Sequence, residues 1–480
     1  MIEHPDFLKD KAVLLINPPW KIMEGNIWKS VASCYPSLGL ALLAGYLEKC
    51  GARVKITDMQ ARSGSLDEMI SGPAPDFVGI TSTTVLLGSA FSVAEKVKKL
   101  WPGTKIVMGG VHPTVQANEV LQNPDVDYVI RGEGERSMAK LVGGLKFEDI
   151  PGLAWMENGR YREHPDLDEL ENLDDFPLPA YHLLPMDSYY PPLGGALNSP
   201  SISFLSTRGC PGRCTYCNSS LSKRLRFYSA FRVVDEIDHL MVHYRIREVT
   251  FYDDSFCADR KRVQDICRLL LERRMKLTWT CMSRINYADQ ETLRLMARAG
   301  CHMICYGVES ADVSILRNIK KNIDLNMVAP VVRMTQRAGI RVRLSFMFGN
   351  PGETVETMEK TLRFAVESRP DLVQFNITTP FPGTEMFEWA DRNGLLLTKD
   401  WSKYDLWNVV MRLPEVTEED IHRYYKLGTR RFYSSAGFIW RFIWNLTKNP
   451  VLIKEIIVYI CRKRKEGVHL ATLEEQKGST

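Results

Sequence analysis

The chain has 480 residues, and its 62 basic and 58 acidic residues leave a formal net charge of +4. A charge so nearly balanced does not indicate a nucleic-acid partner, because nucleic-acid-binding proteins usually carry a clear basic excess. The length predicts about two to four domains, and the sequence has no apolar run of roughly 18 residues or more that could span a membrane.

The eleven cysteines are odd in number and follow no secretory signal. We therefore expect a cytoplasmic protein, because clustered cysteines in a reducing compartment more often bind metal or carry out chemistry than form disulfides. Three of them, Cys210, Cys214 and Cys217, lie close together in the stretch TRGCPGRCTYCNSS.

Residues 1–145 alternate between predicted strands and predicted helices, which is typical of a doubly wound α/β domain. The apolar run at 12–17 is that of a parallel strand covered on both faces, and the helix that follows ends at Gly51. Four more strands are predicted at 53–59, 77–83, 105–110 and 128–135. Ligands bind beyond the carboxyl ends of such strands, so the loops after these five strands are candidate binding segments.

Residues 146–200, with an acidic run followed by repeated prolines, are predicted to form a linker. In residues 201–395 the alternation returns, and six strands in six βα units predict a partial or closed barrel. Barrels carry their chemistry at the carboxyl ends of the strands. The residues predicted near those ends are Cys210, Asp253, Asp254, Arg284, Glu309, Asn350 and Glu353.

Residues 396–480 are predicted to form a helical C-terminal extension. Its stretch 437–466 carries seven Lys or Arg and two Asp or Glu among aromatic and aliphatic residues. Such helices either pack on a neighbouring domain or lie in a membrane interface. Packing is the favoured interpretation, and a peripheral membrane contact is the alternative; Lys454 and Glu455 argue against a spanning helix.

The three clustered cysteines do not fit a zinc site. A structural zinc needs four ligands, and the other close pair, Cys301 and Cys305, is spaced by roughly 13 Å along a predicted strand. A four-iron cluster held by three thiolates instead keeps one iron open, and an open metal position is the mark of a catalytic centre. The polar backbone of the loop around Gly212 can donate N–H groups to cluster sulfurs.

The spacing Cys-x3-Cys-x2-Cys, with Tyr216 before the last cysteine and the motif at the end of the first barrel strand, resembles the signature of the radical S-adenosylmethionine (SAM) superfamily. The resemblance implies a [4Fe-4S] cluster on Cys210, Cys214 and Cys217. It also implies that SAM is cleaved reductively to a 5′-deoxyadenosyl radical, which abstracts hydrogen from a substrate. An electron donor such as flavodoxin or ferredoxin is then an expected partner.

The same resemblance implies roles for residues at other strand ends. Asp253 or Asp254 would hold the SAM ammonium in place of the family's GGE-like motif, and the sequence does not choose between them. Arg284 resembles a basic residue near the SAM carboxylate, and Glu309 an acid near the ribose. The loop at 347–354 resembles the one near adenine. For each acid, the alternative is a salt bridge at the barrel rim.

The first domain, together with this barrel, resembles the cobalamin-binding domain of a large radical SAM subgroup. Ser82 and Thr84 lie at its Ser/Thr turn, and Gly109 and Gly110 match a double-glycine turn that lets a bulky ring approach the backbone. The loop after the first strand lacks the histidine that serves as lower cobalt ligand in cobalamin mutases. For His112, a loop hydrogen bond is the favoured role.

The sequence thus predicts a cobalamin-binding-like domain followed by a radical SAM partial (β/α)6 barrel and a helical extension. The predicted enzyme uses a [4Fe-4S] cluster, SAM and cobalamin to methylate or oxidatively cyclise an unactivated carbon. A lipid-like substrate, such as an isoprenoid or porphyrin, is suggested by the aromatic C-terminal stretch. A cobalamin-independent radical SAM oxidoreductase and a non-enzymatic iron–sulfur electron-transfer or scaffold protein are the alternatives.

Overall fold

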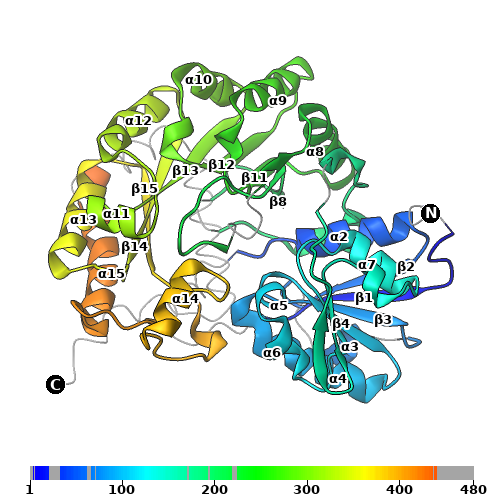
Figure 1. Cartoon of the computed structure of the whole chain (residues 1–480). Helices are drawn as coiled ribbons and strands as arrows, with labels where there is room; N and C mark the ends of the chain where they lie inside the picture. Colours follow the sequence, from blue (N-terminus) through cyan, green and yellow to red (C-terminus); the bar gives the residue numbers. More distant parts are fainter. Residues whose placement is uncertain are drawn as a thin grey trace.

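The structure is a computed structural model in which two α/β bodies lie side by side, as Figure 1 shows. The N-terminal body is drawn in blue and cyan, and the barrel in green to yellow. The structure describes residues 4, 6–20, 33–61, 66–70, 72–169, 172–192, 195–218, 224–435 and 437–439.

The N-terminal body contains a seven-stranded sheet in the order β2-β1-β3-β4-β5-β6-β7. Its first five strands pair in parallel, as the sequence predicts. They are β1 (Ala12–Asn17), β2 (Arg53–Asp58), β3 (Phe77–Thr81), β4 (Lys105–Gly109) and β5 (Tyr128–Ile130). The helices of this body are α2 (Leu38–Lys49), α3 (Leu66–Met69), α4 (Leu87–Leu100), α5 (Val111–Val115), α6 (Ala117–Leu121) and α7 (Glu135–Val142). Since helices cover both faces, strand β1, which lies between β2 and β3, is buried along almost its whole length.

The sheet has two strands more than the sequence pattern predicts. They are β6 (Leu153–Glu157) and β7 (Arg160–Glu163), which form an antiparallel hairpin on the edge of the sheet within the stretch predicted as a linker. The turn between them is Asn158–Gly159, with φ of 51° and 75°. Positive φ at both central residues is the geometry of the tight hairpin turn that an Asn-Gly pair favours. The prediction of five strands missed this turn signal.

The second body is a six-stranded parallel sheet in the order β15-β14-β13-β12-β11-β8. The six strands alternate with helices, so this is the (β/α)6 arrangement predicted from the sequence. The strands are β8 (Ser201–Phe204), β11 (Glu248–Phe251), β12 (Thr278–Ser283), β13 (Cys301–Glu309), β14 (Arg341–Phe348) and β15 (Leu372–Ile377). The helices are α8 (Ala230–Tyr244), α9 (Arg260–Glu272), α10 (Gln290–Arg298), α11 (Val313–Asn318), α12 (Leu325–Arg337), α13 (Val355–Glu367) and α14 (Glu385–Arg392).

Each of these barrel helices begins on a Ser, Thr or Asp side chain that accepts a hydrogen bond from the first turn. Such a cap satisfies a backbone N–H that has no partner within the helix, and it fixes where the preceding loop ends. The caps therefore anchor the loops at the carboxyl ends of the strands. They are Ser229, Asp259, Asp289, Asp312, Asp324, Thr354 and Thr384.

The C-terminal helix α15 (Glu418–Tyr433) packs on β15, and Tyr433 Oη donates a 2.8 Å hydrogen bond to the Val373 carbonyl. Gly428 lies so close to the Phe375 ring that an added Cβ would stand 3.0 Å from it. Most of the aromatic and basic stretch predicted at 437–466 lies outside the described residues. In the part of the chain that the structure describes, no helix is both long enough and apolar enough to cross a membrane.

The two bodies are joined by a buried charge network. Arg208, on the short strand β9 (Thr207–Arg208), binds Glu133 at 3.2 Å and Glu135 at 2.6 Å. Arg226, on β10 (Arg226–Phe227), also binds Glu133, and its side chain is only 3% exposed. Removing one partner from such a network leaves an uncompensated buried charge.

We expect Arg226→Met to lower the free energy of unfolding by about 3–5 kcal/mol, because Glu133 then loses its most buried partner. Calorimetric or denaturant unfolding measures this. Arg268→Met is the matched control: it removes an exposed pair with Asp265 at 2.9 Å and should cost less than about 1 kcal/mol. Equal losses in the two variants would contradict a special role for the network.

Candidate active site

A buried carboxylate holds the segment that leads into the cysteine loop, which is residues 210–217. Asp253, just beyond the end of β11, is fully buried and accepts hydrogen bonds from the backbone N–H of Ser206 at 2.6 Å and of Thr207 at 2.9 Å. Its second oxygen accepts from the Ser206 hydroxyl. Burial raises the pKa of Asp253, and the hydrogen bonds and the nearby Arg262 oppose that rise. Both oxygens of Asp253 are therefore engaged in holding the strand end that leads to Cys210.

Asp254 is the other acid named at this position, and it is exposed. Its charge acts on Cys210: burial raises the pKa of the Cys210 thiol, and the Asp254 carboxylate raises it further. The Gly212 N–H, 3.4 Å from the sulfur, and Arg284 both lower that pKa. Two residues that the sequence leaves equivalent thus differ in the structure: Asp253 is buried with both oxygens hydrogen-bonded, whereas Asp254 is exposed and acts on Cys210 through its charge.

Arg284 reaches the cysteine loop from the end of β12. Its guanidinium donates a 3.4 Å hydrogen bond to the Asn322 carbonyl, and a Cβ added at Gly212 would stand 2.6 Å from its nitrogen and 3.3 Å from the Cys210 sulfur. The absence of a side chain at Gly212 is therefore what lets Arg284 and Cys210 lie together. A cation beside the loop favours thiolates over thiols.

The residues of the loop fit an iron–sulfur cluster. Cys210, Cys214 and Cys217 are free thiols, and none is in a disulfide. Among the described residues, no three His, Cys, Asp or Glu side chains converge tightly enough for a single metal ion. Three thiols on one short loop, beside an arginine and a backbone N–H donor, supply the donor set of a larger cluster with one ligand position left open.

Glu309, at the end of β13, is held by Lys321, a residue that no sequence motif indicates. Lys321 Nζ lies 2.8 Å from its carboxylate, and both side chains are more than 90% buried. Tyr216 is the third side chain of this group. Burial raises the pKa of Tyr216 well above its ordinary value, and the charges of Glu309 and Cys214 raise it further. The rim residue Glu309 and the cysteine loop therefore lie next to each other.

The loop after β14 is a rigid turn built on a buried acid. Glu353 accepts hydrogen bonds from the backbone N–H of Gly349 at 2.5 Å and of Asn350 at 2.9 Å, and it is fully buried. Asn350 in turn accepts a hydrogen bond from Thr378 at 3.0 Å. Burial is the largest effect on Glu353 and raises its pKa to about 7.

The inner face of the barrel is polar. On β14 and β15, buried residues that pack under the helices alternate with half-buried ones on the opposite face. The half-buried set includes Arg343, which donates a 3.3 Å hydrogen bond to the Cys305 sulfur, and Gln374 and Asn376, joined at 3.1 Å. This face of β14 and β15 thus carries groups that can hydrogen-bond a ligand.

A hollow of about 270 Å³ lies at the carboxyl edge of the N-terminal sheet, between that sheet and the barrel. Its walls include Gly39, Gly109 and Gly110 from the N-terminal body and Leu205 and Arg208 from the barrel. A Cβ at Gly39 would meet no atom within 4 Å, so the missing side chain keeps the hollow open. A mostly apolar slot with glycines in its wall suits the edge of a large flat ring, such as the corrin of cobalamin, better than it suits a phosphate.

The structure brings the two predicted glycines to this hollow, and it places Ser82 and Thr84 in the turn beside them. The Ser82 hydroxyl donates to the Thr83 carbonyl at 2.9 Å, and the Thr84 hydroxyl lies 3.3 Å from Nδ1 of His112. His112 is fully buried, its pKa is lowered to about 4 by burial, and its ring packs edge-on against Trp401 at 5.3 Å. These three side chains brace the turns behind the hollow.

Two residues near the cofactor sites were missed from the sequence. Lys321 sits in a Lys-Lys pair after a short helix, and nothing in its spacing distinguishes it from surface lysines. Arg208 lies two residues before Cys210 and could have been noticed as part of the TRGC stretch. The acidic partners of Arg208 are Glu133 and Glu135, about 75 residues earlier in the chain, and no sequence pattern predicts that they pair with Arg208.

Glu353 predicts a pH dependence of stability. Its pKa is about 7 in the folded protein against an ordinary 4.5, so its contribution is fully present below about pH 4.5 and is lost as the pH rises through 7. Relative to Glu353→Gln, the wild type should lose about 3 kcal/mol between these limits. Thermal unfolding of both proteins from pH 4 to 8 checks this, and a difference that does not change with pH would contradict it.

The comparisons with known proteins agree with this geometry. Residues 27–142 match the B12 binding domain family, and residues 204–365 match the radical SAM superfamily. The uncharacterized methyltransferase PH0819 of Pyrococcus horikoshii is 36% identical over 436 residues, covering 89% of this chain and 93% of that protein. The anaerobic magnesium-protoporphyrin IX monomethyl ester cyclase of Rubrivivax gelatinosus is 26% identical over 446 residues, covering 89% and 78%.

A solved structure shares the fold. The radical SAM methyltransferase TsrM of Kitasatospora setae, solved with cobalamin and a [4Fe-4S] cluster bound, superposes with a TM-score of 0.65 at 20% identity, covering 80% of this chain and 78% of that one. The family matches confirm the predicted α/β fold class and the expected cofactors, a [4Fe-4S] cluster, SAM and cobalamin. The chain is therefore an enzyme of the radical SAM superfamily, in the group that carries a B12 binding domain ahead of its radical SAM domain.

Proposed function

We propose that this enzyme methylates an unactivated carbon of its substrate. The observation that carries the proposal is the shared wall between the two cofactor sites. Arg208 lines the hollow of the B12 binding domain and stands two residues before Cys210, so their Cα atoms are at most roughly 7 Å apart. A radical source and a methyl source so close together suit transfer to a single carbon. The name of the 36% identical relative, a methyltransferase, supports the same reading.

Specific residues are proposed to hold the cofactors. Cys210, Cys214 and Cys217 bind the cluster. Bound to it, SAM supplies the 5′-deoxyadenosyl radical, and cobalamin supplies the methyl group. Asp254 is assigned to the SAM ammonium in preference to Asp253, whose oxygens are already engaged.

Three further assignments complete the site. Arg284 is assigned to the SAM carboxylate, because it is the cation that reaches Cys210. Glu309 is assigned to the ribose, with Lys321 fixing its carboxylate at 2.8 Å. Gly109 and Gly110 are assigned to cobalamin, while Ser82 and Thr84 support the turn next to them.

The substrate is proposed to be a small molecule with a large hydrocarbon part and a polar end. The polar inner face, with Arg343, Gln374 and Asn376, would receive the polar end. Relatives include a hopanoid C-3 methylase of Methylococcus capsulatus and the magnesium-protoporphyrin cyclase, whose names point to large hydrophobic substrates. We also propose that the stretch 437–466 contacts a membrane surface. The proposed domain limits are 1–145, 146–200, 201–395 and 396–480.

The test is anaerobic reconstitution with iron, sulfide and a corrinoid, followed by incubation with SAM and a reductant. We expect corrinoid absorbance to stay with the protein and 5′-deoxyadenosine to form. With the magnesium-protoporphyrin monomethyl ester or a hopanoid as trial substrate, the expected product has one hydrogen replaced by a methyl group and is heavier by the mass of one CH2. A turned-over product without added methyl mass would favour oxidative cyclisation, and activity without bound corrinoid would favour a cobalamin-independent oxidoreductase.

Cys214→Ala removes one of three cluster ligands. Its 5′-deoxyadenosine yield should fall by more than about 100-fold, because even changes outside the ligand shell of metal sites cost about 10–100-fold. Iron content and the visible cluster absorbance should fall with it.

Cys267→Ala is the matched control for this variant. Cys267 is a fully buried cysteine on α9, away from the loop, so its replacement should leave the cluster intact. Full SAM cleavage by the Cys214→Ala protein would overturn the assignment of the cluster site.

A further inference from the structure

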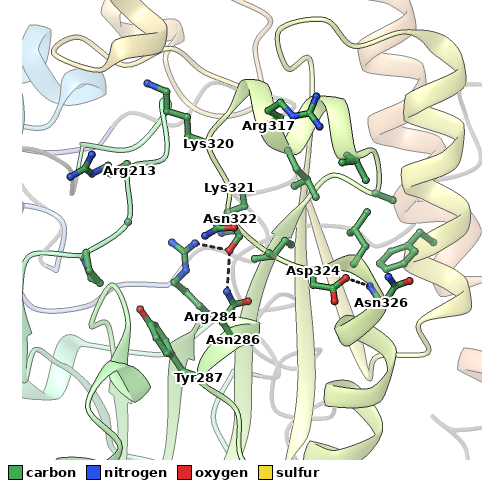
Figure 2. Close-up of a pocket in the computed structure, with 18 of the residues that line it drawn as sticks. Arg213, Arg284, Asn286, Tyr287, Arg317, Lys320, Lys321, Asn322, Asp324 and Asn326 are labelled. Carbon is green, nitrogen blue, oxygen red and sulfur yellow. Dashed lines mark hydrogen bonds between the residues drawn. The ribbon is translucent and has the colours of Figure 1, made fainter.

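A large hollow opens beside the cysteine loop, and it shares no lining residue with the B12 binding domain's hollow. It has a volume of about 1000 Å³ and is shown in Figure 2. One wall is the loop segment Pro211, Gly212 and Arg213, which lies between the first two cluster cysteines. The other walls come from the end of β12, from α11 and the segment that follows it, and from α13. Pro211 and Arg213 are exposed, so this is a face where the cysteine loop meets solvent.

The hollow is strongly cationic. Its lining contains six Lys or Arg and one acid, Asp324. The carboxylate of Asp324 is already used as the N-cap of α12, where it accepts from the Asn326 N–H at 2.9 Å. The six cations are Arg213, Arg284, Arg317, Lys320, Lys321 and Lys360.

The lysines and the arginines of this set differ in their partners. Lys320, Lys321 and Lys360 bind Glu385, Glu309 and Asp312 at 2.6, 2.8 and 2.8 Å. Among the described residues, no carboxylate forms an ion pair with the three arginines of the set. The three lysines are thus compensated by carboxylates, and the cationic excess of the hollow comes from its arginines, in a chain whose 62 basic and 58 acidic residues nearly balance.

The rim of the hollow is partly apolar. Val313, at the start of α11, is 58% exposed, and Arg317 is one turn further along the same helix and also exposed. In Figure 2, Arg213 and Arg317 lie on opposite sides of the opening, with Arg284 between them and lower. Arginine and exposed apolar side chains together are typical of surfaces that bind another protein, and the charge requires that protein to be acidic.

We propose that this surface docks a small acidic one-electron carrier protein that reduces the cluster. The proposal rests on the proposed function, because reductive SAM cleavage needs one electron per turnover. A carrier seated here would contact Pro211 and Arg213, the exposed residues of the loop between Cys210 and Cys214. The carrier loses one electron and the cluster gains it; no proton, bond or group moves in this step. Arg213 and Arg317 steer the carrier, and their effect weakens as salt is raised.

The test uses a flavodoxin, an acidic flavin protein, as the probe. Binding to the reconstituted enzyme is measured by calorimetric titration, and 5′-deoxyadenosine formation is measured with reduced flavodoxin and, separately, with titanium(III) citrate. Arg317→Glu and Lys360→Glu should each weaken flavodoxin binding about fivefold or more and slow the flavodoxin-driven rate at low carrier concentration. The rate with titanium(III) citrate should not change, because that small reductant needs no docking surface.

Arg160→Glu is the matched control, since Arg160 is an exposed arginine on β7, in the other body. Unchanged flavodoxin binding in both hollow variants, or an equal loss in Arg160→Glu, would overturn the proposal. So would thermal stabilisation by millimolar inorganic phosphate that Arg317→Glu abolishes while flavodoxin binding stays intact, because the hollow would then hold a small anion. Failure of the proposed function looks different: the wild type would bind flavodoxin but form no 5′-deoxyadenosine with either reductant.

Discussion

The cofactor region depends on one buried carboxylate. Asp253 accepts three hydrogen bonds from Ser206 and Thr207, and thereby ties the end of β11 to the segment that leads into the cysteine loop. Arg262 braces the same place, donating to the Ser206 carbonyl at 2.9 Å. A buried ionisable group is costly unless its hydrogen bonds are satisfied, and here both oxygens of the acid are. A loop with few regular contacts of its own is in this way attached to a rigid strand end.

The same segment also sets the relation between the two cofactor sites. Leu205 and Arg208 form part of the B12 binding domain's hollow, and Cys210 begins the cysteine loop. Arg208 is held by Glu133 and Glu135 of the N-terminal body, so the charge network that joins the bodies also positions the entrance to the loop. The two cofactor sites therefore cannot move apart without breaking buried ion pairs, which favours a fixed spacing between them.

The sequence predicts most of this architecture because strand and helix periodicities and helix-ending glycines are local signals. The cysteine spacing and the double glycine at 109–110 are local as well. The β6–β7 hairpin was missed although its Asn-Gly turn was present, because the acidic, proline-rich stretch after it suggested a linker. The choice between Asp253 and Asp254 could not be made from the sequence, since it depends on which carboxylate the Ser206 and Thr207 backbone reaches. Lys321 could not be found because its role depends on a partner brought to it by the fold.

Glu309 shows how several local choices combine at the rim of the barrel. It has a φ of 73°, in the left-handed region that costs a residue with a Cβ of order 1 kcal/mol or more. A Cβ at Gly307 would stand 2.3 Å from the Glu309 carboxylate, so only glycine lets that side chain fold back over the strand. Lys321 then fixes it at 2.8 Å. A strand can end without any of these three features: the strained backbone of Glu309, the glycine at 307 and the buried pair with Lys321. Together they hold one carboxylate in a set direction beside Tyr216 and the cysteine loop, as the role proposed for Glu309 in orienting a bound cofactor requires.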